Sequence, residues 1–164
     1  MTVTVAAVRN PQPEATQRFE RILLASEGRQ IPAAAISKVI ELAAPGAFVH
    51  VFTIARVHGV AFGLPSPGLL PTKQEWAEQR DIVTQAIRRL RRKGLKADGH
   101  VLGTRNAFKK IIKEAAEHDC QAIVMSADPD RNRVLGNLLW TQEPQRVRRR
   151  AKLPVFLVLE DDQL

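Results

Sequence analysis

The sequence is poor in cysteine, in long apolar runs and in the signals that export a protein. With Cys120 as the one cysteine among 164 residues, the chain cannot build a disulfide framework, and a reducing cytoplasm is the expected compartment. Charged residues break each apolar run well short of the ~18 residues that a membrane-spanning helix needs. Residues 1–18 lack the basic and apolar regions of a secretory signal, and we expect a short leader that need not be ordered.

The overall composition of the chain is typical of one folded domain. Apolar residues make up 45% of the chain and charged residues 26%, and the apolar residues recur periodically, which excludes disorder as the main state. A chain of ~150 residues buries roughly 70% of its unfolded surface in a single domain. We expect that domain at residues 19–160, followed by an acidic tail at residues 161–164.

The net charge of +8 is unevenly distributed. Residues 88–113 and 131–152 are strongly basic, with Asp98 and Glu143 as their respective acidic residues, whereas the remainder is net acidic. Such polarisation favours an anionic partner, although basic helix ends are also commonly just solvated. The candidate contacts for that partner are Arg88, Arg89, Arg91, Arg92, Arg148 and Arg149.

Apolar periodicity predicts strands and helices in alternation. Short apolar or β-branched runs predict strands at residues 21–26, 47–54, 96–102, 121–125 and 154–159. Helical periodicity predicts helices, caps included, at residues 33–44, 72–93, 106–118 and 141–151. Strands that alternate with helices form βαβ units, so we expect an α/β fold with an open five-stranded parallel sheet and helices on both faces.

In open parallel sheets, the position of the ligand site follows a general rule. Ligands bind beyond the carboxyl ends of the strands, at the point where the strand order reverses. The loops concerned follow the first predicted strand, at residues 26–30, and the fourth, at residues 126–136. The rule therefore nominates these two loops before any family is considered.

Three sequence blocks carry a resemblance to a known family. They are Ile-Leu-Leu-Ala-Ser-Glu-Gly at residues 22–28, Ala-Ile-Val-Met at residues 122–125, and Arg-Val-x-Arg-x-Ala-x-x-Pro-Val at residues 146–155. Over about residues 19–159 the chain resembles a universal stress protein domain. The resemblance implies a Rossmann-type sheet in the order 3-2-1-4-5 and a role in stress response. It also implies a nucleotide site with an acidic residue after the first strand and a G-x-x-G-x9-G-[S/T] loop after the fourth.

The loop after the fourth strand departs from the family pattern. Glu27 stands where the family usually has Asp, which adds one methylene. Counted from Met125, Ser126 and Pro129 fall on the first two glycines of the motif. Counted back from Arg146 and Val147, Thr141 and Gln142 fall on its final Gly-[S/T], so the loop is two residues longer than the motif as well as poor in glycine. Phosphate cradles need glycine because backbone N–H groups must approach the oxygens with unusual backbone angles and no Cβ in the way. We therefore expect no tight ATP binding of the family's usual kind.

The nucleotide site that the resemblance implies is thus degenerate. An apolar floor for adenine around Val51 and Met125 leaves weak adenine nucleotide binding open, and no other cofactor is expected. Arg131 and Arg133 of this loop either replace part of the lost phosphate contacts with charge-assisted bonds or are simply solvated. The residues of this degenerate site are Ser26, Glu27, Val51, Met125, Ser126, Arg131, Thr141 and Gln142.

The sequence favours a regulatory or binding module over a turnover enzyme, because it shows no nucleophile–base pair and no carboxylate dyad. His50, His58, His100 and His118 show no ligand spacing, so no metal is expected. One alternative is nucleotide hydrolysis by Glu27 with the loop that carries Arg131 and Arg133. A second alternative is weak electrostatic binding of nucleic acid.

The last predicted strand suggests self-association. The family commonly dimerises through its fifth strand, and residues 154–159 are apolar on both faces. An exposed apolar edge strand is an aggregation liability unless it is paired or covered. We expect a homodimer centred on Pro154, Val155, Phe156, Leu157 and Val158.

Overall fold

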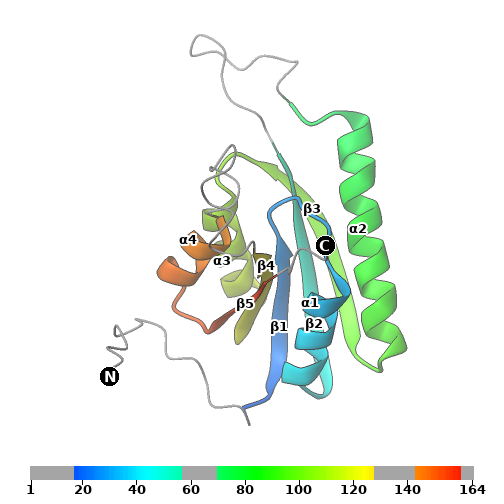
Figure 1. Cartoon of the computed structure of the whole chain (residues 1–164), viewed down its shortest axis with the longest axis vertical. Coiled ribbons are helices and arrows are strands. Elements are labelled where there is room, and N and C mark those ends of the chain that lie inside the picture. Colours follow the sequence, from blue (N-terminus) through cyan, green and yellow to red (C-terminus); the bar gives the residue numbers. More distant parts are fainter. Residues whose placement is uncertain (1–16, 57–69, 128–142, 160–164) are drawn as a thin grey trace.

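A computed structural model describes residues 17–56, 70–127 and 143–159, in which strands and helices alternate along the chain. The strands are β1 (Phe19–Ser26), β2 (Ala43–Arg56), β3 (Lys96–Thr104), β4 (Ala122–Ala127) and β5 (Val155–Leu159). The helices are α1 (Ala33–Leu42), α2 (Lys73–Arg92), α3 (Ala107–Glu117) and α4 (Glu143–Arg150). The strands form one sheet in the order β3-β2-β1-β4-β5, with every pair parallel (Figure 1). The predicted fold class and strand order are confirmed.

Helices cover both faces of this sheet because successive strand residues point to opposite sides. Leu24 belongs to an apolar cluster that packs against α1 and α2, whereas the adjacent Leu23 belongs to a second cluster that packs against α3 and α4. Both leucines are fully buried. Figure 1 shows α2 along one side of the sheet and α3 with α4 on the other. Each central strand is therefore apolar on both faces, which explains the near-continuous apolar runs in the sequence.

The largest difference between the predicted and the observed boundaries lies between α1 and β2; the other ends differ by up to two residues. Helix α1 ends at Leu42 rather than at residue 44, and β2 begins at Ala43 rather than at residue 47. The early start of β2 comes from a register shift, since Ala43 pairs with Phe19 while Phe48 pairs with Arg21. Residues 1–16 of the leader expected at residues 1–18, and the whole tail at residues 161–164, lie outside the described residues.

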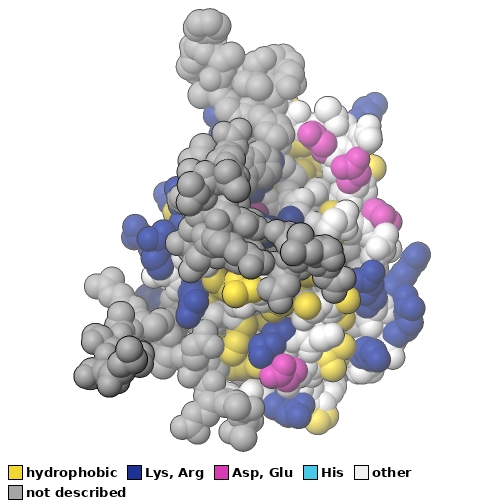
Figure 2. All heavy atoms as spheres, viewed as in Figure 1, with side chains coloured by type: hydrophobic (Ala, Val, Ile, Leu, Met, Phe, Trp, Pro, Cys, Tyr) yellow, Lys and Arg dark blue, Asp and Glu magenta, His cyan; other side chains and the backbone are white. Residues whose placement is uncertain are grey.

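Helix α2 separates its charges along its length. Its amino end has a capping box, in which the Thr72 hydroxyl accepts from the Glu75 N–H and the Glu75 carboxylate accepts from the Thr72 N–H. Arginines occupy its last turn, so both ends complement the helix dipole. The second basic stretch includes α4, which packs on the opposite face of the sheet from α2. Figure 2 shows the exposed Lys and Arg side chains in separate groups on the visible face.

Strand β5 is an edge of the sheet and is only partly buried. Val155 and Phe156 are buried, and the Phe156 ring packs edge-on against Phe19 at 6.1 Å between centroids. Leu157 and Val158 are half-buried, and Leu159 is exposed.

No helix in the described part of the chain combines the length and the apolarity needed to cross a bilayer.

Candidate functional site

The turn after β1 is fixed by its own polar groups. The Ser26 hydroxyl donates to the Arg29 carbonyl at 2.6 Å and accepts from the Gly28 N–H at 3.2 Å. Gly28 has φ +118°, and a Cβ there would lie 3.1 Å from the Ile54 carbonyl oxygen. Only glycine fits this conformation and this close approach without strain. The sequence Ser-Glu-Gly therefore sets the shape of the turn that carries Glu27.

Glu27 is a buried carboxyl group in this turn, with 2% of its surface exposed. Its Oε1 accepts from the Arg29 guanidinium, and its backbone carbonyl accepts from Arg56 Nε at 2.8 Å. Burial raises the pKa of Glu27, and the charges of Arg29 and Arg56 only partly oppose that rise. Its Oε2 is buried with no hydrogen-bond partner. The second carboxyl oxygen is thus a strong hydrogen-bonding group that nothing in the described structure satisfies.

Two more buried polar atoms without a hydrogen-bond partner lie close to the same turn. Thr53 Oγ1 is one, and Thr53 pairs with Ser26 in the β1–β2 register. Gln79 Oε1 is the other, and the amide nitrogen of Gln79 donates to the Gly28 carbonyl at 2.9 Å. Unsatisfied buried polar groups are costly, and a bound ligand or water commonly satisfies them. Their gathering around one turn is typical of a binding site.

A cavity of about 190 Å³ opens beside this turn. Arg56, at the end of β2, contributes to its wall together with Gln79. Burial lowers the pKa of Arg56 to about 10, and the negative charges of Glu27 and Glu143 oppose that decrease. Arg56 remains cationic at neutral pH, so the cavity combines a cation with amide and carboxyl groups. The remaining residues of the wall are Gly28, Ile54, Ala55, Glu75 and Glu78.

The structure brings some of the predicted site residues together and separates others. Ser26 and Ser126, at the ends of neighbouring strands, are both buried. Val51 lies in the apolar cluster beside α1 and α2, whereas Met125 lies in the cluster beside α3 and α4, and neither has exposed surface. These two side chains face opposite sides of the sheet and do not share one floor. Arg131, Arg133, Thr141 and Gln142 lie outside the described residues.

Glu143, the first residue of α4, joins two helices near this site. Its Oε2 accepts from the Phe108 N–H at 2.9 Å, and its Oε1 accepts from Arg146 at 3.1 Å. The Asn106 side chain, which the sequence predicts as the cap of α3, makes no capping hydrogen bond. A carboxylate from a distant helix takes over that role, because the first N–H groups of a helix need an acceptor from any source.

Several residues of the site were not predicted. Gln79 is a polar residue on the apolar stripe of α2, at helical spacing from Ile82 and Val83, and this misplaced polarity is a usable signal. A second group of polar side chains, around Glu114 and His118, was not predicted as a site, because the histidines show no ligand spacing among themselves. Glu114 lies on α3 and His118 is its carboxyl-terminal cap four positions later, a spacing that brings the two side chains to the same side of the helix.

Comparison with sequence families gives a match over most of the chain. The model of the "Universal stress protein family" matches residues 18–158. A comparison with curated proteins gave no match.

Comparison with solved structures finds the same fold. A protein from the universal stress protein family of Burkholderia pseudomallei is 21% identical, with a TM-score of 0.61 over 85% of this chain and 96% of that one. The universal stress protein from Archaeoglobus fulgidus in complex with dAMP is 18% identical, with a TM-score of 0.58 over 87% and 98%. A universal stress protein in complex with cAMP is 18% identical, with a TM-score of 0.59 over the same shares.

Proposed function

This chain belongs to the universal stress protein family, and from that premise we propose that it is a cytoplasmic stress-response binding module rather than a turnover enzyme. Its ligand site is the turn after β1, with Glu27 at its centre and the cavity lined by Arg56 and Gln79 beside it. The two similar proteins solved with dAMP and cAMP support an adenine-containing ligand for this site. The ligand is a nucleoside or nucleoside monophosphate that binds weakly.

The observation that carries this proposal is the unpartnered Oε2 of the buried Glu27. An amino group of a base or a hydroxyl of a ribose donates to an ionised carboxylate, and such a charge-assisted bond is roughly twice as strong as a neutral one. The burial that raises the pKa of Glu27 also makes an added donor more valuable. Gln79 and Thr53 supply further acceptors near the same turn.

Tight binding of ATP does not fit this chain. Ser126, Pro129 and Thr141 stand at the glycine positions of the phosphate loop, and proline removes a backbone donor outright. Each lost charge-assisted hydrogen bond weakens binding by about 1.5–3 kcal/mol. The triphosphate would thus contribute little affinity, while contacts to the base and the ribose would remain.

Calorimetric titration with adenosine, AMP and Mg-ATP tests this function. We expect weak binding of the first two and no large gain in affinity for Mg-ATP. Glu27→Gln should weaken adenosine binding by tenfold or more. Glu41→Gln is the matched control, because Glu41 is exposed on α1 and pairs only with Lys38 among the described residues. A low-micromolar dissociation constant for Mg-ATP would overturn the proposed ligand class, as would equal adenosine affinities of the two variants.

We also propose that the protein is a homodimer that pairs through β5. This strand is the edge of the sheet beyond β4, and its half-buried Leu157 and Val158 leave apolar surface available to a second copy. Antiparallel pairing around a two-fold axis would satisfy the backbone groups of the edge.

A further inference from the structure

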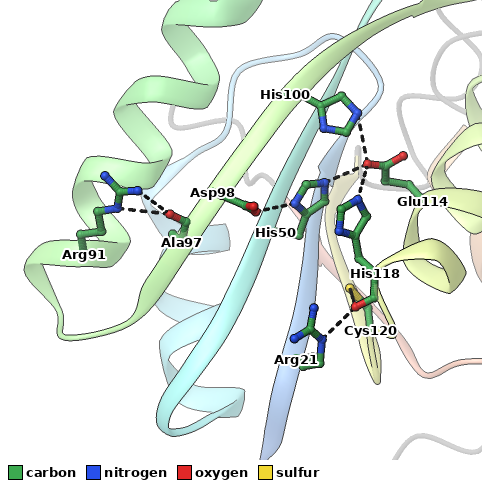
Figure 3. Close-up of polar contacts among 9 residues, drawn as sticks. All are labelled: Arg21, His50, Arg91, Ala97, Asp98, His100, Glu114, His118 and Cys120. Carbon is green, nitrogen blue, oxygen red and sulfur yellow. Dashed lines mark hydrogen bonds and ion pairs between the residues drawn. The ribbon is translucent and has the colours of Figure 1, made fainter.

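Five titratable side chains converge between the sheet and α3, away from the turn after β1 (Figure 3). We call them the histidine–carboxylate cluster, and its members are His50, Asp98, His100, Glu114 and His118. Three imidazole nitrogens approach one atom, Glu114 Oε1. His50 Nε2 lies 2.8 Å from it, and the Nε2 atoms of His100 and His118 each lie 3.1 Å from it.

The fold assembles the cluster from three elements. In the β2–β3 register His50 pairs with Asp98 and Phe52 pairs with His100, so side chains of both strands reach the same face. Glu114 lies on α3 above that face, and His118 caps the carboxyl end of the same helix four positions later. The rings of His50 and His118 stack at 3.7 Å between centroids. Residues distant in sequence therefore meet at one point, which explains why their spacing in the sequence gives no signal.

The protonation of His50 leaves a problem at the centre of the cluster. Its Nδ1 lies 2.6 Å from Asp98 Oδ1, and in the tautomer with the proton on Nδ1 the ring donates to that carboxylate. In a neutral imidazole the Nε2 then has a lone pair, and this lone pair points at a carboxylate oxygen 2.8 Å away. Both His50 and Glu114 are buried. Two facing lone pairs repel, so either a second proton or a metal ion must lie between them.

We propose that the cluster is a binding site for a divalent transition-metal ion of the zinc class, with His50, Glu114 and His118 as ligands. Their ligating atoms all lie within 4.8 Å of one another. Zn–N and Zn–O bonds of about 2.0–2.2 Å in tetrahedral geometry place ligand atoms about 3.3 Å apart. The separations of 2.8 and 3.1 Å around Glu114 Oε1 need an expansion of only a few tenths of an ångström.

Asp98 supports this assignment as the positioning residue of His50. Histidines that bind a metal through one nitrogen almost always donate the other N–H to a carboxylate or carbonyl, which fixes the tautomer. His50 makes this contact through Nδ1, and its Nε2 is the atom turned to the centre. Nitrogen ligands with one carboxylate suit zinc, copper and nickel, whereas magnesium and calcium prefer oxygen ligands.

His100 completes the set and sits at its entrance. Its side chain is 46% exposed, against 3% for His50, so an ion can enter from its side. His100 Nε2 lies 3.1 Å from Glu114 Oε1, outside the group of three ligands, and a movement of its exposed ring towards the ion would supply a fourth ligand and close the site. The ion would link β2 and β3 to α3. It would do so independently of any ligand beside Glu27.

The test uses protein without a polyhistidine tag, treated with a chelator and titrated with Zn²⁺ by calorimetry and with Co²⁺ by visible absorption. We expect one equivalent to bind at pH 7, with the intense d–d bands of tetrahedral cobalt. His118→Ala and Glu114→Gln should weaken binding by a hundredfold or more. Asp98→Asn should weaken it by about 10- to 100-fold, the usual effect of losing such a partner.

The matched control is Glu117→Gln on the same helix, because Glu117 is exposed and pairs with Lys113 rather than with the cluster. Glu117→Gln should bind the metal with the affinity of the wild type, and zinc should raise the melting temperatures of these two proteins by the same amount. Circular dichroism of the metal-free proteins separates loss of binding from loss of fold. Absence of tetrahedral cobalt bands in the folded wild type would overturn the proposal. Equal zinc affinities of Glu114→Gln and Glu117→Gln would also overturn it.

Discussion

Replacing Arg29 by methionine tests whether the ion pair with Glu27 holds a buried charge in place. The Arg29 side chain is 19% exposed and that of Glu27 only 2%. Methionine keeps much of the apolar part of the Arg29 side chain but removes its guanidinium, which donates a hydrogen bond to Glu27 Oε1. Breaking a buried ion pair by removing one partner costs about 3–5 kcal/mol, because the other charge stays buried. Arg56 also stabilises the Glu27 charge, so we expect the lower end, about 3 kcal/mol at pH 7.

The pH dependence of this loss has a definite sign. Burial raises the folded-state pKa of Glu27 above its ordinary value of 4.5. The stability contributed by the protonated carboxyl is therefore fully present below the unfolded pKa and is lost as the pH rises through the folded pKa. Without Arg29 the folded pKa rises further. The difference between wild type and Arg29→Met should therefore be small near pH 4 and grow towards pH 7.

Urea unfolding followed by circular dichroism between pH 4 and pH 8 measures this difference. A loss of about 3 kcal/mol corresponds to roughly 6–12 °C in melting temperature for a chain of this size. The double variant Glu27→Gln/Arg29→Met removes both charges of this ion pair and should regain about half of the loss. Arg88→Met is the control, since it removes the same charge from an exposed position of α2. A loss independent of pH, or a double variant no more stable than Arg29→Met, would refute the reasoning.

Two further predictions concern surfaces. Val158→Lys places a charge on the edge strand and should convert the dimer into a monomer, as measured by size-exclusion chromatography with light scattering. Its circular dichroism spectrum should stay unchanged. A monomeric wild type at micromolar concentration would contradict the proposed dimer. Exposed arginines in the carboxyl half of α2 should bind polyanions weakly and in a salt-dependent way. The double variant Arg88→Glu/Arg92→Glu should therefore elute from a heparin column at lower salt than the wild type. Unchanged elution would exclude this surface as the contact with the polyanion.

Much of the fold follows from the sequence because the periodicity of strands and helices depends on local residues. The apolar run at residues 21–26 predicted the core of β1, and the proline and glycine after residue 44 predicted a break near the end of α1. The extension of β2 back to Ala43 did not follow, because it depends on a register shift opposite Phe19. A shift of this kind is set by the pairing of two distant segments, which no local pattern records.

The candidate site was predicted in outline only. The position of Glu27 after the first strand follows from the general rule for parallel sheets, but its burial and its pairing with Arg29 depend on the turn geometry. Val51 and Met125 were expected on one floor, although the strand pleat turns them to opposite faces. The histidine–carboxylate cluster escaped prediction because its members meet only after β2, β3 and α3 have packed together.

The short connection between α3 and β4 fixes how α3 is oriented against the sheet. It consists of residues 118–121 alone, with Asp119 at φ +50°. Two bonds to Arg21 anchor it, since the guanidinium donates to the His118 carbonyl and the Gln121 N–H donates to the Arg21 carbonyl, both at 2.8 Å. Inserting or deleting one residue in this connection would change how the end of α3 is held against β1 and β4, and would displace Glu114 from His50 while leaving the composition of the chain almost unchanged. Homologous chains can therefore keep all three histidines and still lose the cluster, so the length of this connection is as informative as the residues themselves.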